Sequence, residues 1–213
     1  MATDDQEFSY ISNDADYRHL EDPERYKLLY EEVGSVTANR EIRWRSEWMY
    51  HFQPRAGATI LELGAHNGPN LLHYGRLGHE VIGVELSTTL IATFETQKQL
   101  ETEDVQARIS MRQGWIEAFL PDKRYDYVLV TEVLEHVIDP VNILAKAAEC
   151  VKPDGEVYIS SPTQHWGNNT HVRGVPPKDL AQWLEQANLE PISLFTEPHG
   201  WTFCMARCKS LCA

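Results

Sequence analysis

The sequence is poor in positive charge and has no long apolar run. It contains 19 basic residues against 32 acidic ones, which gives a formal net charge of −13. This average field repels a polyphosphate chain, and no basic stripe offsets it locally, so we expect no nucleic-acid partner. No apolar run approaches the roughly 20 residues that a membrane-spanning helix needs, so we also expect no membrane span.

Cysteine is scarce as well, and its spacing does not match a metal site. The four cysteines are Cys150, Cys204, Cys208 and Cys212. The last three are four positions apart, whereas zinc ligands usually come in closer pairs with a second pair nearby. We therefore interpret all four as reduced thiols. The acidic N-terminal segment has no apolar signal core, so we expect a cytoplasmic protein.

Residues 1–57 differ in pattern from the rest of the chain. Residues 1–22 are polar and acidic without a clear period, and we expect a loose arm there. Helical patterns follow over 23–33, with proline at the first position, and over 37–52. We therefore expect 1–57 to form an acidic arm and a helical N-terminal cap.

From residue 58 onwards, apolar runs alternate with helical patterns. Such alternation is typical of an α/β domain with a mainly parallel sheet, and we expect one such domain over 58–213. Five strands in this series are followed by a C-terminal antiparallel pair, which makes seven strands. The expected strands span residues 58–63, 80–86, 105–112, 125–131, 156–162, 191–198 and 200–208, and the expected helices span residues 69–77, 87–99, 140–151 and 176–189.

The segment ATILELGAHNGPN leaves the first strand through a loop with two glycines. Gly64 and Gly68 remove side chains there, which lets a ligand approach the backbone N–H groups ahead of a helix. Glu85 ends the second strand about 20 residues later, where dinucleotide-type folds place an acid on a ribose diol. Together these features favour an adenosine-containing ligand. A tight turn and a surface glutamate are the alternative.

The loop does not match the fingerprint of a pyrophosphate-binding turn. GAHNGPN has three residues between its glycines and lacks the third glycine of G-x-G-x-x-G. Glu62 precedes the first glycine, where a carboxylate meets a positively charged α-amino group better than a pyrophosphate. The loop therefore favours a zwitterion beside a nucleoside, and a nucleotide-dependent oxidoreductase is a weaker alternative.

Five segments together resemble a known family. ILELGAHNGPN, VIGVELS, GWIEAF, YDYVLVTEVLEHVIDP and VKPDGEVYISSPT occur in the order seen in class I S-adenosylmethionine-dependent methyltransferases. The sequence is most similar to the type 11 group, which includes ubiquinone-biosynthesis O-methyltransferases. This resemblance covers residues 58–162 firmly. It implies a Rossmann-like, doubly wound sheet and S-adenosyl-L-methionine as the cofactor.

The resemblance also assigns residues to parts of the cofactor. It places them in four groups, which are Glu62, Gly64, Ala65 and Gly68 at the methionine end, Glu85 on the ribose hydroxyls, Leu86, Gln113, Gly114 and Trp115 around the adenine, and Glu132 and Val133 beneath the cofactor. The family's loop often carries more glycine than this one does. Asn67 could add a side-chain hydrogen bond to the cofactor.

The segment SPTQHWGNNTHVRGVPP is the expected source of the acceptor site. It leaves the fifth strand at the edge that carries the cofactor crevice, and it contains two histidines whose usual pKa suits a general base. His171 is the first candidate for base or substrate contact, and His165 is the second. Alternatively, His171 has only a structural role and holds the loop against the rest of the protein through hydrogen bonds. Arg173 could bind an anionic substrate group or pair with a local acid.

The acids that follow the fourth strand allow a metal-binding interpretation. Glu132, Glu135 and His136 could be ligands of a divalent cation. We favour another arrangement, in which Glu132 faces the crevice, whereas Glu135 and His136 stabilise the start of the segment that follows. The sequence therefore predicts no metal site. Aromatic side chains of the N-terminal helices could cover the crevice, although packing against the sheet explains most of them.

These observations lead to a functional hypothesis. We expect methyl transfer to a small-molecule acceptor, with an oxygen nucleophile on a metabolite or sugar first and a nitrogen nucleophile second. A cofactor-binding regulator or partner subunit without chemistry is an alternative of another class. The sequence leaves a homodimer open.

Overall fold

The computed structural model describes residues 22–37, 51–165 and 170–209. The second helix expected over 37–52, with Trp44, Trp48 and Tyr50, lies almost entirely outside these ranges. Within the described part of the chain, no helix is both long enough and apolar enough to cross a membrane.

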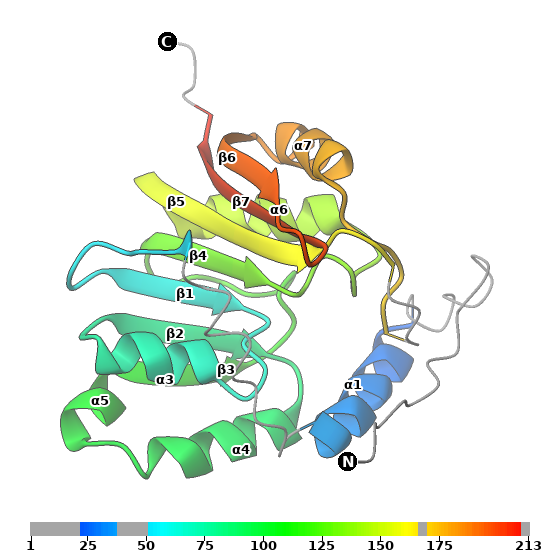
Figure 1. Cartoon of the computed structure of the whole chain (residues 1–213). Helices are drawn as coiled ribbons and strands as arrows, with labels where there is room; N and C mark the ends of the chain where they lie inside the picture. The colour runs from blue at the N-terminus through cyan, green and yellow to red at the C-terminus, as the bar shows by residue number, and fades with distance from the viewer. Residues whose placement is uncertain (1–21, 38–50, 166–169, 210–213) are drawn as a thin grey trace.

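A seven-stranded sheet forms the centre of the molecule, as the sequence predicts (Figure 1). Its spatial order is β3-β2-β1-β4-β5-β7-β6. Strands β1 to β5 are parallel, and β7 runs antiparallel between β5 and β6. The strands are β1 (Thr59–Leu63), β2 (Glu80–Glu85), β3 (Ile109–Gln113), β4 (Tyr125–Thr131), β5 (Val151–Pro162), β6 (Leu189–Thr196) and β7 (Trp201–Cys208).

The chain reverses its direction of travel across the sheet between β1 and β4. It moves outward from β1 to β3 and then returns to lay β4 and β5 on the other side of β1. Ligands of open α/β sheets bind beyond the carboxyl ends of the strands at such a point. The topology therefore places the crevice at the ends of β1, β2 and β4.

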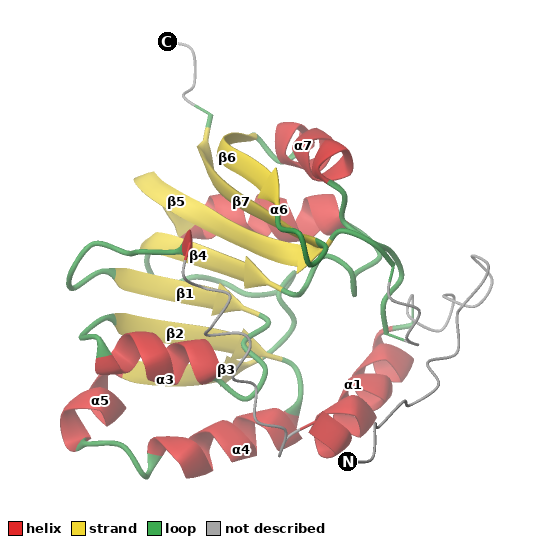
Figure 2. Ribbon diagram, viewed as in Figure 1, coloured by secondary structure: helices red, strands yellow, loops and turns green. Residues whose placement is uncertain are grey.

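Helices cover both faces of the sheet (Figure 2). One apolar core lies under α3 (Pro69–Arg76), α4 (Thr88–Lys98) and α5 (Glu103–Arg108). A second core lies under α6 (Pro140–Cys150) and α7 (Pro177–Gln186). Alternate residues of β1 serve the two cores, with Ile60 in the first and Leu61 in the second, because successive side chains of a strand point to opposite faces. The fold is therefore doubly wound.

Helix α1 (Pro23–Thr37) lies apart from these layers, beyond the carboxyl ends of the parallel strands and beside the start of α4 (Figure 1). Phe52, which also belongs to the expected cap, is buried in the core beneath α3 against Tyr74, Tyr127 and Tyr158.

The strand expected over 105–112 is partly wrong. Residues Glu103–Arg108 form α5, and β3 begins only at Ile109. The helix forms because the Thr102 side chain caps it by accepting a hydrogen bond from the Val105 N–H, with two acids in its first turn. Apolar and polar residues alternate from Val105 to Arg112 across this boundary, and this strand-like alternation obscured it in the sequence.

Candidate functional site

The loop between β1 and α3 has the backbone that its glycines suggest. Gly64 and Gly68 both have φ of +78°, in the left-handed region that favours glycine. A Cβ atom at Gly64 would lie 2.7 Å from Val133 Cγ2, and one at Gly68 would overlap the ring of Phe94. The two glycines therefore let the loop pack closely against its own protein neighbours.

The loop's N–H groups are already used within the protein. Gly64 and Ala65 both donate to the Val84 carbonyl, at 2.9 and 3.0 Å, and Gly68 donates to the Ala65 carbonyl at 2.9 Å. The His66 N–H donates to the Glu85 carboxylate at 2.8 Å. These four N–H groups are therefore bonded inside the protein. The loop's contribution is to hold Glu85 in place and to let a ligand come close to the backbone.

Glu85 lies at the end of β2 and is only 6% exposed. Its Oε1 accepts hydrogen bonds from the N–H groups of Leu86 and Ser87, at 2.8 and 2.9 Å, and its Oε2 accepts the bond from His66. A carboxylate has about four lone-pair sites and only accepts hydrogen bonds when ionised, which is the chemistry that a ribose hydroxyl requires. The structure fixes this acceptor beside the glycine loop.

Glu62 is completely buried between three elements. Its Oε1 accepts hydrogen bonds from Asn70 Nδ2 in α3 at 2.6 Å and from Thr131 Oγ1 at the end of β4 at 2.8 Å. Sequence reasoning did not include Asn70 and Thr131. Their signal was positional, since one stands in the first turn of the helix after the loop and the other ends the strand beside β1.

The segment after β3 lies beside Glu85. The Gly114 N–H donates to the Glu85 carbonyl at 3.0 Å, and the Gln113 amide donates to the Leu86 carbonyl at 3.5 Å. Apart from its two chain neighbours, no described residue has an atom within 4 Å of a Cβ built at Gly114, so this glycine borders open space. The half-buried Trp115 follows. A carboxylate acceptor, an open glycine and an aromatic ring fit the ribose and base of a nucleoside.

Glu132 directly follows β4 and has a left-handed conformation, with φ of +55°. Trp201 Nε1 donates to both of its carboxylate oxygens at 3.0 Å, and Ser160 Oγ donates to Oε1 at 3.1 Å. These bonds direct the carboxylate toward β5 and β7, while Val133 packs under Gly64. Trp201 was missed because its partner lies 69 positions away in the sequence.

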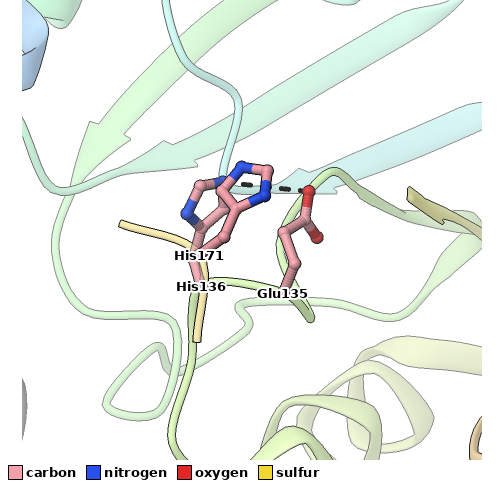
Figure 3. A group of neighbouring side chains, drawn as sticks. All are labelled: Glu135, His136 and His171. Carbon is pink, nitrogen blue, oxygen red and sulfur yellow. Dashed lines mark ion pairs between the residues drawn. The ribbon is translucent and has the colours of Figure 1, made fainter. Parts of the chain in front are cut away.

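Three other side chains converge beside this point (Figure 3). One ligand atom each from Glu135, His136 and His171 lies within 4.8 Å of the others. The rings of the two histidines are 4.5 Å apart and nearly perpendicular. His171 thus joins Glu135 and His136, whereas the sequence had grouped these two with Glu132. The expectation that no metal binds here stays a prediction.

Hydrogen bonds fix the orientation of this cluster. The Thr170 carbonyl lies 3.0 Å from His136 Nδ1 and can only accept, so Nδ1 carries the proton. His136 Nε2 then faces Glu135 Oε1 at 3.8 Å. Ser161 Oγ donates to the other oxygen of Glu135. Two acceptor atoms therefore approach each other in the cluster when His136 is neutral.

The loop that carries His171 is docked on the β4–α6 connection. The Val172 N–H donates to the Glu135 carbonyl at 2.7 Å, and Arg173 donates to the Ile138 carbonyl at 3.0 Å. His165 Nε2 donates to the His171 carbonyl at 2.7 Å, so His165 supports the loop. Burial, together with His136 and His165 nearby, lowers the pKa of His171 to about 3.

Two tyrosines of α1 lie over the same region. Tyr26 and Tyr30 stack with ring centroids 4.7 Å apart. Tyr26 also lies 5.3 Å from the ring of Trp115 and donates through its hydroxyl to the His136 carbonyl at 3.4 Å, while Tyr30 lies 6.0 Å from the His136 ring. These side chains span the distance between the expected adenine site and the cluster, which supports a lid.

A family comparison agrees with this geometry. The model of the family described as a methyltransferase domain matches residues 37–194. The chain belongs to this family. It is a class I S-adenosylmethionine-dependent methyltransferase, and S-adenosylmethionine is its cofactor.

Similar proteins carry related names. The ubiquinone biosynthesis O-methyltransferase of Hydrogenovibrio crunogenus is 27% identical over 182 residues, which cover 75% of this chain and 74% of that protein. The protein of the same name from Rhodopseudomonas palustris strain TIE-1 is 32% identical over 166 residues, and the match covers 69% of this chain and 62% of that protein. The chain thus spans less than two thirds of this second relative.

Solved structures share the fold at low sequence identity. The glycopeptide N-methyltransferase MtfA superposes with a TM-score of 0.65 at 18% identity, covering 82% of this chain and 90% of that one. The 1,6-didemethyltoxoflavin-N1-methyltransferase of Burkholderia thailandensis gives 0.66 at 18% identity, with coverage of 89% and 91%. At this identity the likeness establishes the Rossmann-like methyltransferase fold alone.

Proposed function

We propose that this methyltransferase transfers a methyl group to an oxygen of a small-molecule acceptor. The observation that carries this proposal is the cluster of Glu135, His136 and His171, which lies under the same tyrosines as the expected adenine site. A hydroxyl group must lose a proton during the transfer, and the cluster offers the Glu135 carboxylate and the His136 imidazole to accept or share it. The His171 ring is suited to contact with the acceptor instead, because a pKa of about 3 makes it a weak base. Both relatives described above are named as O-methyltransferases.

The cofactor-binding residues are part of the proposal. The bound cofactor supplies an electrophilic methyl group on a sulfonium. We assign its surroundings to Glu62, Gly64, Ala65, Asn67, Gly68, Glu85, Leu86, Gln113, Gly114, Trp115, Glu132 and Val133. The contacts support direct roles for Glu85, Gly114 and Trp115. They support positioning roles for Glu62 and Glu132, whose carboxylates bond to neighbouring elements.

The protein's own contribution is alignment and exclusion of water. Methyl transfer needs the acceptor oxygen in line with the methyl group and little water nearby. The tyrosines of α1 lie over that region, against Trp115 and His136, where they would help to exclude water. We assign acceptor contact to His171 and support of its loop to His165. An aromatic acceptor would stack on Tyr26 and Tyr30. A sugar acceptor would instead form hydrogen bonds with the polar loop that carries His165 and His171. The ubiquinone-related names favour a ring hydroxyl.

The cluster is also suited to a divalent cation. Two imidazoles and one carboxylate form a ligand set that transition metals accept, and the atoms come from two loops docked on each other. When His136 is neutral, its Nε2 lone pair faces Glu135 Oε1 at 3.8 Å, and either a proton on Nε2 or a shared cation would relieve that approach. With a cation bound, His171 would be a metal ligand instead of contacting the acceptor.

Methyl transfer with isotope-labelled S-adenosylmethionine tests the proposal. Acceptors would be catechol, a simple phenol, a hexose and a primary amine, with mass spectrometry locating the methyl group. We expect an O-methylated product together with S-adenosylhomocysteine. An N-methylated product alone would favour the second choice of nucleophile. Cofactor binding without transfer to any acceptor of a wider metabolite extract would favour the non-catalytic regulator. A homodimer and a cytoplasmic location stay predictions.

A further inference from the structure

Glu31 reaches from α1 to the first turn of α4. One carboxylate oxygen accepts hydrogen bonds from the Thr88 N–H at 2.6 Å and its hydroxyl at 2.9 Å. The other accepts from the Ser87 hydroxyl at 3.0 Å and from the Thr89 hydroxyl and N–H at 3.1 and 3.4 Å. The N–H groups of a helix's first turn lack partners in their own helix. A residue of α1 therefore caps α4 from outside.

The charge of Glu31 suits this position. Loss of water around the carboxylate would by itself raise its pKa, but hydrogen bonds from Thr88, Ser87 and Thr89 lower the pKa to about 2. The group is therefore ionised at neutral pH. A negative charge is also favoured at the positive end of a helix. The contact between the two helices is thus charge-assisted.

Gly34 allows the two helices to approach. It is buried, and a Cβ atom built on it would lie 2.5 Å from Ser87 Oγ and 3.3 Å from Leu90 Cγ. Ser87 is the residue that caps α4 through its own hydroxyl, which accepts from the Leu90 N–H at 3.3 Å. The backbone of α1 therefore touches the same turn that Glu31 caps, one helical turn further along.

The docked helix carries the tyrosines of the site. Tyr30 is adjacent to Glu31 in sequence, and Tyr26 lies about one turn earlier on the same helix, so both depend on where α1 rests. Ser87 is in turn held by Glu85, which accepts its N–H at 2.9 Å. Figure 1 shows α1 against the start of α4, beyond the carboxyl ends of the parallel strands.

We infer that Glu31 is a positioning residue, which docks α1 on α4 and thereby holds Tyr26 and Tyr30 across the cofactor crevice. This inference rests on the proposed function, because it assumes that the cofactor lies between the glycine loop and Trp115. With α1 released, the mouth of the crevice opens beside Trp115. The carboxylate of Glu31 therefore controls how long the cofactor remains bound.

The test is the release rate of S-adenosylhomocysteine, followed by stopped-flow or surface plasmon resonance on the full chain. Glu31→Ala removes the carboxylate, and Gly34→Ala pushes on Ser87 without changing charge. We expect both to speed dissociation by about tenfold, with association changed less than about threefold. Glu31→Gln keeps the shape and one acceptor, so its rate should lie between those of the wild type and Glu31→Ala.

Two controls separate this role from general stability. Glu24→Gln removes a charge from the exposed start of the same helix, and Leu184→Ala destabilises the distant, buried face of α7. Both variants should release S-adenosylhomocysteine at the wild-type rate. The inference would be overturned if Glu31→Ala released S-adenosylhomocysteine at the wild-type rate, or if Leu184→Ala released it as fast as Glu31→Ala. Either result would leave the proposed function intact. Failure of the wild type to bind S-adenosylhomocysteine would overturn the proposed cofactor site as well.

Discussion

Gly64 offers a sharp test at the scale of single residues, because the chain supplies a matched control. Gly64→Ala combines a strained left-handed φ with a Cβ atom 2.7 Å from Val133. Gly57 has a similar φ of +68°, but its Cβ position meets nothing within 4 Å in the described part of the chain. We expect Gly64→Ala to weaken cofactor binding by about 1–3 kcal/mol relative to Gly57→Ala, measured by calorimetry. Equal affinities would contradict the role of this loop.

Glu85→Gln tests the acceptor at the end of β2. The amide would lose the charge and one of the oxygens that accept backbone N–H groups and the ribose. Cofactor affinity should fall by about 1–3 kcal/mol. Glu80→Gln on the exposed start of the same strand is the control, and its affinity should equal that of the wild type. An unchanged dissociation constant for Glu85→Gln would exclude the residue from ribose binding.

Metal removal distinguishes the two roles proposed for the cluster of Glu135, His136 and His171. If the cluster holds a divalent cation, dialysis against a chelator should lower turnover and added Mg²⁺, Mn²⁺ or Zn²⁺ should restore it, because the ligand set matches such a cation. His171→Ala should lower turnover more than cofactor affinity and should resist this rescue. If chelation leaves turnover unchanged while His171→Ala still lowers it, the histidine contacts the acceptor directly and no cation is needed.

The sequence predicted that certain residues lie near one another, but it did not predict how they are connected. Gly64, Gly68 and Glu85 are close together, as the strand and loop pattern indicated. Their connection was not visible, because the loop's N–H groups serve Val84 and Glu85 instead of facing a ligand. Hydrogen bonds of this kind depend on backbone orientation, which residue types alone do not determine.

Among whole elements, the antiparallel hairpin has a function that its sequence did not indicate. Trp201 at the start of β7 donates to the buried Glu132 carboxylate at the end of β4. Trp201→Phe removes this donor and should lower the free energy of unfolding by about 1–3 kcal/mol in urea denaturation. Trp183→Phe, which alters a half-buried ring under Arg173, should cost less than about 1 kcal/mol. If both variants lost the same unfolding free energy, the bond between Trp201 and Glu132 would not be a special source of stability.

Element types were predicted well where a strong period agreed with local signals. Asp139 and Pro140 marked the start of α6 correctly, and Asp139 caps it by accepting from the Asn142 N–H. The segment before β3 failed because Val105 and Ile109 fit either a strand or a helix. In the structure Val105 packs under α3 beside Gly75, a contact between distant segments that no local pattern reveals.

For the whole molecule, the expected division at residue 57 stays a prediction, but the described parts of the expected cap pack against the domain that follows. Phe52 belongs to the core beneath α3, and α1 rests on α4 and on the β4–α6 connection. The cap thus completes the domain that follows it. The sequence left its role open, because the aromatic residues of α1 suit a cover over the crevice and packing on a sheet equally well.

A crystal structure of the chain grown with S-adenosylhomocysteine tests the cofactor site most directly. We expect the nucleoside beyond the carboxyl ends of β1 and β2, with its ribose hydroxyls within hydrogen-bonding distance of the Glu85 carboxylate and its base beside Trp115. A ligand bound elsewhere, or a ribose held by other residues while Glu85 keeps only its backbone partners, would contradict the assignment of this crevice.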